Sequence, residues 1–207
     1  MKDYRKVLTE QERASKIERA TEAYEAFMDE ILPGWQNDPN SKDTPHRVAK
    51  MYVNELYSGL YGKEPKITSF DNVDGYDGMV FQGVIEVKSQ CSHHHMPFFG
   101  KAYVSYIPGS KGSIIGLSKL NRIVEFLSRR PQVQENLTMQ IVDYVKKVVG
   151  DCLGVAVMIE ANHTCVSHRG IRQGSTMITA KMSGTFLDNT DKSRDEFYQF
   201  VNLTKRL

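Results

Sequence analysis

The sequence predicts an α+β fold whose strands pair mainly in the antiparallel direction. Apolar residues recur every three or four positions in the N-terminal part of the chain, which is the spacing of amphipathic helices. A period of two follows in 79–88, 101–107 and 175–186, which is the spacing of half-buried strands. Helical segments lie between groups of strands rather than after every strand, and this order favours an antiparallel sheet with helices packed on it.

The first predicted element is an amphipathic helix over residues 9–32. Its apolar stripe consists of Ala14, Ile17, Thr21, Tyr24, Met28 and Ile31. Thr9 and Glu12 have the spacing of a capping box, in which each residue bonds a free backbone N–H of the other. Pro33 and Gly34 end the helix.

A second helix is predicted from Pro45 to about Ser58. Proline is favoured at the first helical position, and Gly59 supplies the stop. We therefore expect residues 1–62 to form an N-terminal helical region and residues 63–207 to form a single structural unit.

The rest of the chain alternates between the two periods. Residues 117–128 and 131–149 are predicted helices, and 155–160 is a buried strand. Ile114 and Ile115 resume an apolar segment after a glycine turn, and a short helix over 193–207 closes the chain.

The composition excludes several protein classes. The chain has 207 residues, of which 40% are hydrophobic and 25% charged, as in soluble globular proteins. Twenty-seven basic against 25 acidic residues give a net charge of +2, which does not favour a nucleic-acid binder. No apolar run reaches the length of a membrane span, and the N-terminus lacks the apolar core of a secretory signal. We expect a cytoplasmic protein whose three cysteines are thiols or metal ligands.

Two short segments, 90–98 and 160–170, hold five of the six histidines and two of the three cysteines. Each follows a predicted strand, where loops commonly carry function. Thiolate and imidazole are the ligands that zinc prefers, and Cys-x-x-His and His-x-Cys spacings allow a turn to converge on one ion. Three interpretations stay open at this point: ordinary polar loops, a closed structural zinc site, and a catalytic zinc site with a free position for water.

Scattered cations offer a second kind of chemistry, the binding of phosphate groups. They are Arg47, Lys50, Lys119, Arg122 and Arg169. Each alone is by default a solvated surface residue, although arginine matches phosphate oxygens well. Ser118 adds a hydroxyl at a helix start, and Glu135 is either a favourable first-turn carboxylate or an acceptor for the N1–H and 2-amino groups of a guanine.

Taken together, these segments resemble the GTP cyclohydrolase I family. The resemblance runs from about Asp43 to Phe186, and looser similarity reaches both termini. Its motifs are Asp-Thr-Pro-x-Arg-Val-Ala-Lys-Met-Tyr (43–52), Cys-x-His-His (91–94), Gly-Leu-Ser-Lys-Leu-x-Arg-Ile-Val (116–124), Gln-Val-Gln-Glu-x-Leu-Thr (132–138), Glu-Ala-x-His-x-Cys (160–165) and Arg-Gly (169–170).

The resemblance implies a tunnelling fold, an antiparallel sheet with helices on one side that closes into a barrel when subunits assemble. It also implies a homodecamer with active sites at subunit interfaces. The implied reaction converts GTP and water to 7,8-dihydroneopterin triphosphate and formate, the first step towards folate, other pterins or 7-deazaguanine bases. The partners expected are therefore GTP and further copies of the chain, with neither nucleic acid nor membrane.

The resemblance also implies roles for individual residues. Zinc is expected on Cys91, His94 and Cys165, and proton transfer on His93 and His163, with Ser118 assisting in the later steps. Guanine is assigned to Gln134 and Glu135. The triphosphate is assigned to Arg47, Lys50, Lys119, Arg122 and Arg169.

Two positions depart from the family pattern, and they keep other functions open. Ser92 stands where the family usually has Glu, and His95 stands where it usually has an apolar residue. Loss of a carboxylate beside the metal removes an acceptor that orients a ligand or substrate. Two alternatives to the full reaction therefore stay open: a binding protein without turnover, and an enzyme that stops after ring opening. The related 7-deazaguanine nitrile reductases use a cysteine nucleophile without zinc, and the Cys-x-His-His cluster argues against that activity.

Overall fold

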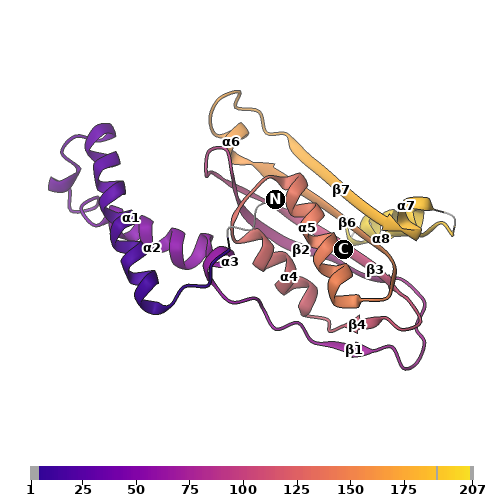
Figure 1. Ribbon diagram of the computed structural model, residues 1–207. Coiled ribbons are helices and arrows are strands. Elements are labelled where there is room, and N and C mark those ends of the chain that lie inside the picture. Colours follow the sequence, from indigo (N-terminus) through magenta and orange to yellow (C-terminus); the bar gives the residue numbers. More distant parts are fainter. Residues whose placement is uncertain (1–4, 190, 206–207) are drawn as a thin grey trace. The chain divides into compact units, whose positions relative to one another are not determined.

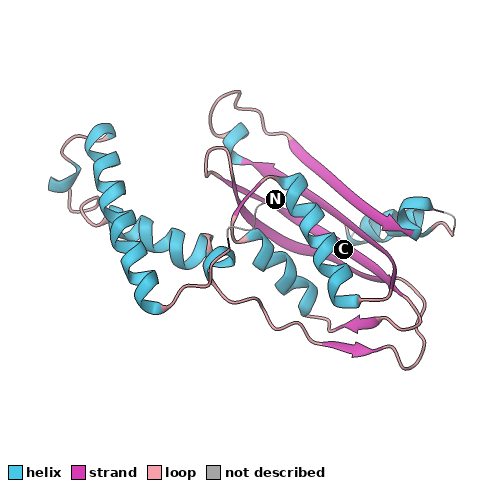
Figure 2. Ribbon diagram, in the orientation of Figure 1, coloured by secondary structure: helices cyan, strands magenta, loops and turns pink. Residues whose placement is uncertain are grey.

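The computed structural model describes residues 5–189 and 191–205, and the chain divides into two compact units, Met1–Glu64 and Pro65–Leu207. The first unit is helical, and the second contains all the strands (Figures 1 and 2). No helix within the described ranges combines the length and the apolar composition that a membrane span requires.

In the first unit, helix α1 (Glu10–Ile31) begins with the predicted capping box. The Glu12 amide donates to the Thr9 hydroxyl at 3.2 Å, and the Thr9 amide donates to the Glu12 carboxylate at 2.9 Å. The chain then turns at Gly34, whose φ of +84° is a left-handed conformation that glycine adopts without strain. Met28 is the buried residue of α1, and a short 3₁₀ helix follows at Trp35–Asn37.

The second predicted helix is divided into three short pieces and ends later than predicted. Helix α2 (Thr44–Met51) continues into a π-helical turn (Tyr52–Leu56) and then α3 (Ser58–Tyr61). Gly59 lies inside α3 and is buried, and the chain leaves the helix at Gly62 instead. The stop at Gly59 fails because the Tyr57 amide bonds the Tyr52 carbonyl at 2.9 Å, which carries the helical path past it.

In the second unit, the main sheet has the strand order β5-β2-β3-β6-β7. Its strands are β2 (Val80–Cys91), β3 (Pro97–Pro108), β5 (Pro131–Gln132), β6 (Cys152–His163) and β7 (Thr176–Gly184). All neighbours pair antiparallel except the short parallel pair β2–β5. β3 and β6 are longer than predicted because much of each is buried on both faces, which hides the period of two.

Two further short strands form a separate pair, of which the sequence predicted one. Strand β1 (Ser69–Asp71) pairs antiparallel with β4 (Ser113–Ile115). β4 contains the predicted apolar segment, whereas the three exposed residues of β1 are too few to show a periodic pattern.

The two long helices of this unit, α4 (Lys119–Ser128) and α5 (Gln134–Val149), lie side by side over one face of the sheet (Figure 1). The main core lies between these helices and the sheet. It includes Val104, Val157, Ile123 and Ile141, which are all fully buried. Burial of this apolar surface is the main force that holds the helices to the sheet.

A smaller core covers part of the opposite face. It includes Tyr103, Met158, Phe186, Phe197 and Val201. The last two come from α8 (Ser193–Thr204), which follows the short helix α7 (Thr185–Asp188). The predicted fold class, an α+β tunnelling fold with its long helices on one side, is confirmed, and the C-terminal helix adds a second packed layer. Residues 206 and 207, which the predicted last helix includes, lie outside the described residues.

Candidate active site

The first of the two functional segments is the turn between β2 and β3. Cys91 is the last residue of β2, and its amide donates to the Met96 carbonyl at 2.8 Å. The His95 amide bonds back to the Cys91 carbonyl at 2.8 Å, with His95 at a φ of +54°. Ser92 donates its amide to Gln132 of β5 at 2.9 Å. These bonds fix a tight turn that leaves Ser92 and the three histidines exposed and turns the Cys91 sulfur inward.

The second segment begins where β6 ends. His163 is the last residue of β6, and the short helix α6 (Thr164–Ser167) carries Cys165. The Thr164 hydroxyl donates to the Pro97 carbonyl at 2.6 Å, which fastens α6 to the start of β3. Since β3 and β6 are paired along their length, both functional segments meet at the same end of the sheet.

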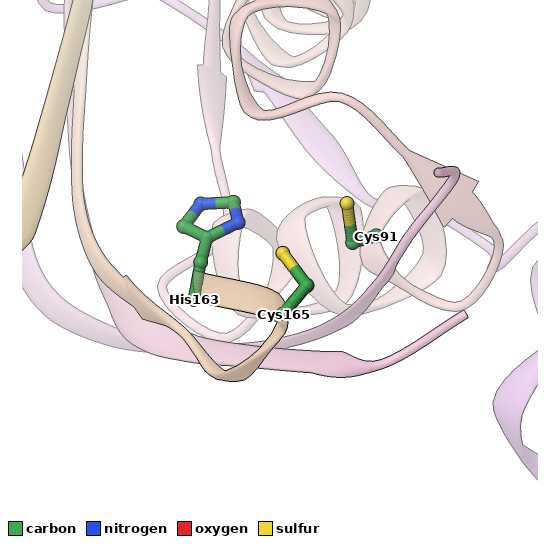
Figure 3. A group of neighbouring side chains, drawn as sticks. All are labelled: Cys91, His163 and Cys165. Carbon is green, nitrogen blue, oxygen red and sulfur yellow. The ribbon is translucent and has the colours of Figure 1, made fainter. Parts of the chain in front are cut away.

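Cys91, His163 and Cys165 form a group whose possible ligand atoms all lie within 4.8 Å of one another (Figure 3). Cys91 is only 4% exposed, and the other two are half-buried. Burial raises the pKa of the Cys165 thiol, and the neighbouring Cys91 sulfur raises it further. Two thiols that face each other away from water fit a divalent cation, because binding the cation replaces their protons.

The imidazole of His163 is held from two sides. Its ring stacks on that of Phe98, with centroids 4.5 Å apart and an interplanar angle of 11°. Its Nε2 lies 2.8 Å from Oε1 of Gln134, the first residue of α5. Burial lowers the pKa of His163, while the negative charge of Glu135 acts in the opposite direction.

The other two predicted histidines lie on the exposed side of the turn. His93 Nδ1 is 3.6 Å from the Cys91 sulfur. His94 Nε2 is 3.1 Å from a guanidinium nitrogen of Arg169, an exposed residue that follows α6. His94 therefore neighbours the group of three without belonging to it.

The predicted phosphate contacts fall into separate places. Ser118 and Lys119 line an open hollow of about 580 Å³ beside β1, together with Gly116 and Asn121. Arg122 follows on the first turn of α4 and is exposed. Arg47 and Lys50 belong to the first unit, where both are exposed on α2.

The two predicted guanine contacts differ sharply in exposure. Glu135 is exposed in the first turn of α5, whereas Gln134 is 1% exposed and turned inward. Sequence reasoning missed the inward direction of Gln134 and the stacking of Phe98. The stacking depends on the cross-strand pairing of Phe98 with His163, which no local spacing reveals.

Comparisons with known proteins agree on one family. The GTP cyclohydrolase I family model matches residues 20–202. The chain is 42% identical over 198 residues to a protein of Flavobacterium johnsoniae named GTP cyclohydrolase 1, covering 95% of this chain and 85% of that protein. It is 46% identical over 166 residues to the protein of the same name from Klebsiella pneumoniae, covering 80% and 73% of the two chains.

Among solved structures, the apo form of the archaeosine synthase QueF-Like aligns with a TM-score of 0.43 and 19% identity, covering 51% of this chain and 93% of that one. A likeness this distant carries no argument about the site.

Proposed function

The chain belongs to the GTP cyclohydrolase I family, and on this premise we propose how its residues convert GTP and water to 7,8-dihydroneopterin triphosphate and formate. The observation that carries the proposal is the convergence of Cys91, Cys165 and His163 at one end of the sheet. Family membership implies a metal at the site, and the donor chemistry of this group fits one.

We propose that the metal is zinc and that Cys91, Cys165 and His94 hold it. The facing thiols support the first two ligands, and His94 lies three residues after Cys91 on the exposed turn that begins there. When bound, zinc supplies a Lewis acid that allows water to act as a nucleophile near neutral pH.

His163 would then act on the purine rather than on the metal. The nitrogen that leaves C8 must gain a proton as the imidazole ring opens, and a histidine can supply one near pH 7. The stacking on Phe98 and the hydrogen bond with Gln134 support this role, because a proton donor works only in a fixed orientation.

The steps after ring opening need further proton transfers. The ribose opens, rearranges and recloses on the exposed amine as a pterin. His93, exposed on the turn beside Cys91, and the hydroxyl of Ser118 are the residues that we assign to these transfers.

Substrate recognition is assigned to exposed side chains outside the group of Cys91, His163 and Cys165. Glu135 would accept the N1–H and 2-amino hydrogens of guanine. Positive side chains of the second unit, Lys119, Arg122 and Arg169, would bind the triphosphate. The family resemblance assigns Arg47 and Lys50 of α2 to the same group. Arg169 is already beside His94, which supports a place for the phosphates near the metal ligands.

We also propose that the sheet closes by subunit assembly into the homodecamer that the family implies. Within the described residues, β2 pairs with β5 only at Gln90 and Cys91, and β7 pairs only with β6. Both outer edges are therefore available to strands of other copies. Light scattering of the metal-loaded protein would give ten times the mass of one chain, and a monomer mass would contradict the proposal.

The function is tested by anaerobic incubation of the zinc-loaded protein with GTP, with formate and the fluorescence of the oxidised pterin measured together. Equal amounts of both support the full reaction and make Ser92 a tolerated variation. Formate without a pterin would indicate arrest after formate release, and a formamidopyrimidine without either would indicate arrest after ring opening. Unchanged GTP would contradict the proposal.

A further inference from the structure

We propose that Gln134 is a positioning residue that fixes the ring orientation of His163, and that its side chain does not read the guanine base. This inference rests on the proton-transfer role proposed for His163.

The orientation of this amide is determined by its surroundings. One end lies 3.1 Å from the Ile159 carbonyl oxygen, 3.1 Å from the Met177 carbonyl oxygen and 3.1 Å from the Thr179 hydroxyl. Carbonyl oxygens only accept hydrogen bonds, so this end must be the NH₂ group. The amide oxygen is left to face His163 Nε2 at 2.8 Å.

An amide oxygen only accepts, and His163 must therefore donate from Nε2. Figure 3 shows Nδ1, the ring nitrogen next to the point of attachment, on the side of Cys165 and Cys91. Gln134 thus fixes which ring nitrogen faces the two thiols.

Two threonines support Gln134 from behind: Thr138 is buried and Thr179 is half-buried. Thr138 Oγ1 lies 2.8 Å from the Gln134 backbone carbonyl and 2.7 Å from Thr179 Oγ1. Thr138 is one turn further along α5, and Thr179 is on β7. α5 and β7 therefore both hold the Gln134 amide in place. The Phe98 ring prevents the imidazole of His163 from tilting.

The same bonds remove this side chain from substrate recognition. Its two N–H groups and its oxygen all have partners within the chain, and 1% of its surface is exposed. The neighbouring Glu135 is exposed and remains the guanine acceptor at the start of α5.

The first test compares two substitutions in the zinc-loaded enzyme. Gln134→Met keeps the volume but loses both kinds of hydrogen bond, and we expect kcat to fall about 10–100-fold with KM for GTP within about twofold of wild type. Gln134→Glu keeps an acceptor for Nε2–H but loses both donors to the Ile159 and Met177 carbonyls, so we expect its kcat to lie between those of Gln134→Met and wild type, with KM within about twofold of wild type. A raised KM with unchanged kcat in either variant would overturn the inference. If Gln134→Met does not fold, the KM of Gln134→Glu decides the question.

The second test places Gln134→Met in the His163→Ala background. A residue that acts through His163 has nothing to position there, so the double variant should lose less than about twofold further activity. Equilibrium dialysis should give the same GTP dissociation constant with and without Gln134→Met in this background. Additive losses of activity, or a GTP affinity that falls about tenfold, would show that Gln134 acts on the substrate.

The role of His163 and the role of Gln134 can be refuted separately. Unchanged turnover in His163→Ala alone would refute the role of His163. A large loss in His163→Ala together with full activity in Gln134→Met would leave that role intact and refute only the role of Gln134.

Discussion

The inner and outer halves of the candidate site are built in opposite ways. The inner half, made of Cys91, Cys165, His163, Phe98 and Gln134, is packed and hydrogen-bonded within one chain. The outer half consists of residues that are exposed or line an open hollow, namely His93, His94, Ser118, Lys119, Arg122, Glu135 and Arg169. On the proposed function, the inner side chains are held in place within one chain before substrate arrives, whereas the outer side chains would gain their contacts when GTP binds.

This comparison predicts that substitutions of the inner residues, and of the proposed metal ligand His94, mainly lower turnover. Substitutions of Glu135 and of the outer cations should mainly weaken substrate binding.

Cys165→Ala should have the largest effect, because it removes one of the two facing thiols. We expect loss of stoichiometric zinc and a fall in turnover of more than about 10³-fold. Metal analysis of the purified variant, with Cys152→Ala as the matched thiol control, is the measurement. Full zinc content in Cys165→Ala would refute the ligand assignment.

His163→Ala should block the formation of the pterin through loss of the proton donor. General acid catalysis contributes typically about 10²–10⁴-fold, and we expect a loss within that range. Product formation from GTP is followed by pterin fluorescence, with His168→Ala as the control on the neighbouring exposed histidine. Unchanged turnover would remove His163 from the mechanism.

Glu135→Gln should weaken GTP binding by replacing one acceptor with a donor, at a cost of about 1–3 kcal/mol. The wild type should prefer GTP over ITP, since inosine lacks the 2-amino group, and the variant should lose part of that preference. The ratio of kcat/KM for GTP to kcat/KM for ITP measures this preference in the wild type and in the variant. Equal use of GTP and ITP by the wild type would contradict the assignment.

Arg169→Gln should raise KM for GTP by about 3–10-fold with a smaller change in kcat, because several other cations share the triphosphate. Arg172→Gln is the matched control, since it removes the same charge from the same exposed loop. Equal effects of the two substitutions would show a general charge effect rather than a specific contact.

The smallest effect is expected at the capping box of α1. The Lys6 ammonium and the Thr9 donors lower the pKa of Glu12 from 4.5 to about 2. The ionised carboxylate therefore contributes stability above about pH 4.5, and this contribution is lost as the pH falls towards 2. The difference in melting temperature between wild type and Glu12→Gln should shrink as the pH falls from 6 to 3. A constant difference over that range would contradict the pKa shift.

Much of the architecture is predictable from local patterns. The capping box at Thr9, the helices α4 and α5, and the alternating strands all follow from spacing and turn residues. Strand ends do not, because burial on both faces depends on tertiary context. The π-helical turn at Tyr52–Leu56 also does not, because nothing in the residue spacing distinguishes it from an α-helical turn.

The candidate site divides in a similar way. The two short clusters of Cys and His favour a metal site, because thiolate and imidazole are the ligands that zinc prefers, whereas a catalytic rather than a structural site is implied only by the family resemblance. The direction of each side chain is a different matter. That Gln134 faces His163 and that His94 faces Arg169 follow from how α5, β6 and the β2–β3 turn pack, and no spacing in the sequence contains that information.

The proposed roles of His94 as a metal ligand and of His163 in proton transfer are distinguished by the zinc content of the two alanine variants. Both proteins would be purified in parallel, loaded with zinc, dialysed, and analysed for metal per chain. We predict that His163→Ala retains zinc at the wild-type stoichiometry and that His94→Ala loses it. Zinc lost from His163→Ala and retained in His94→Ala would contradict these roles and make His163 the third ligand.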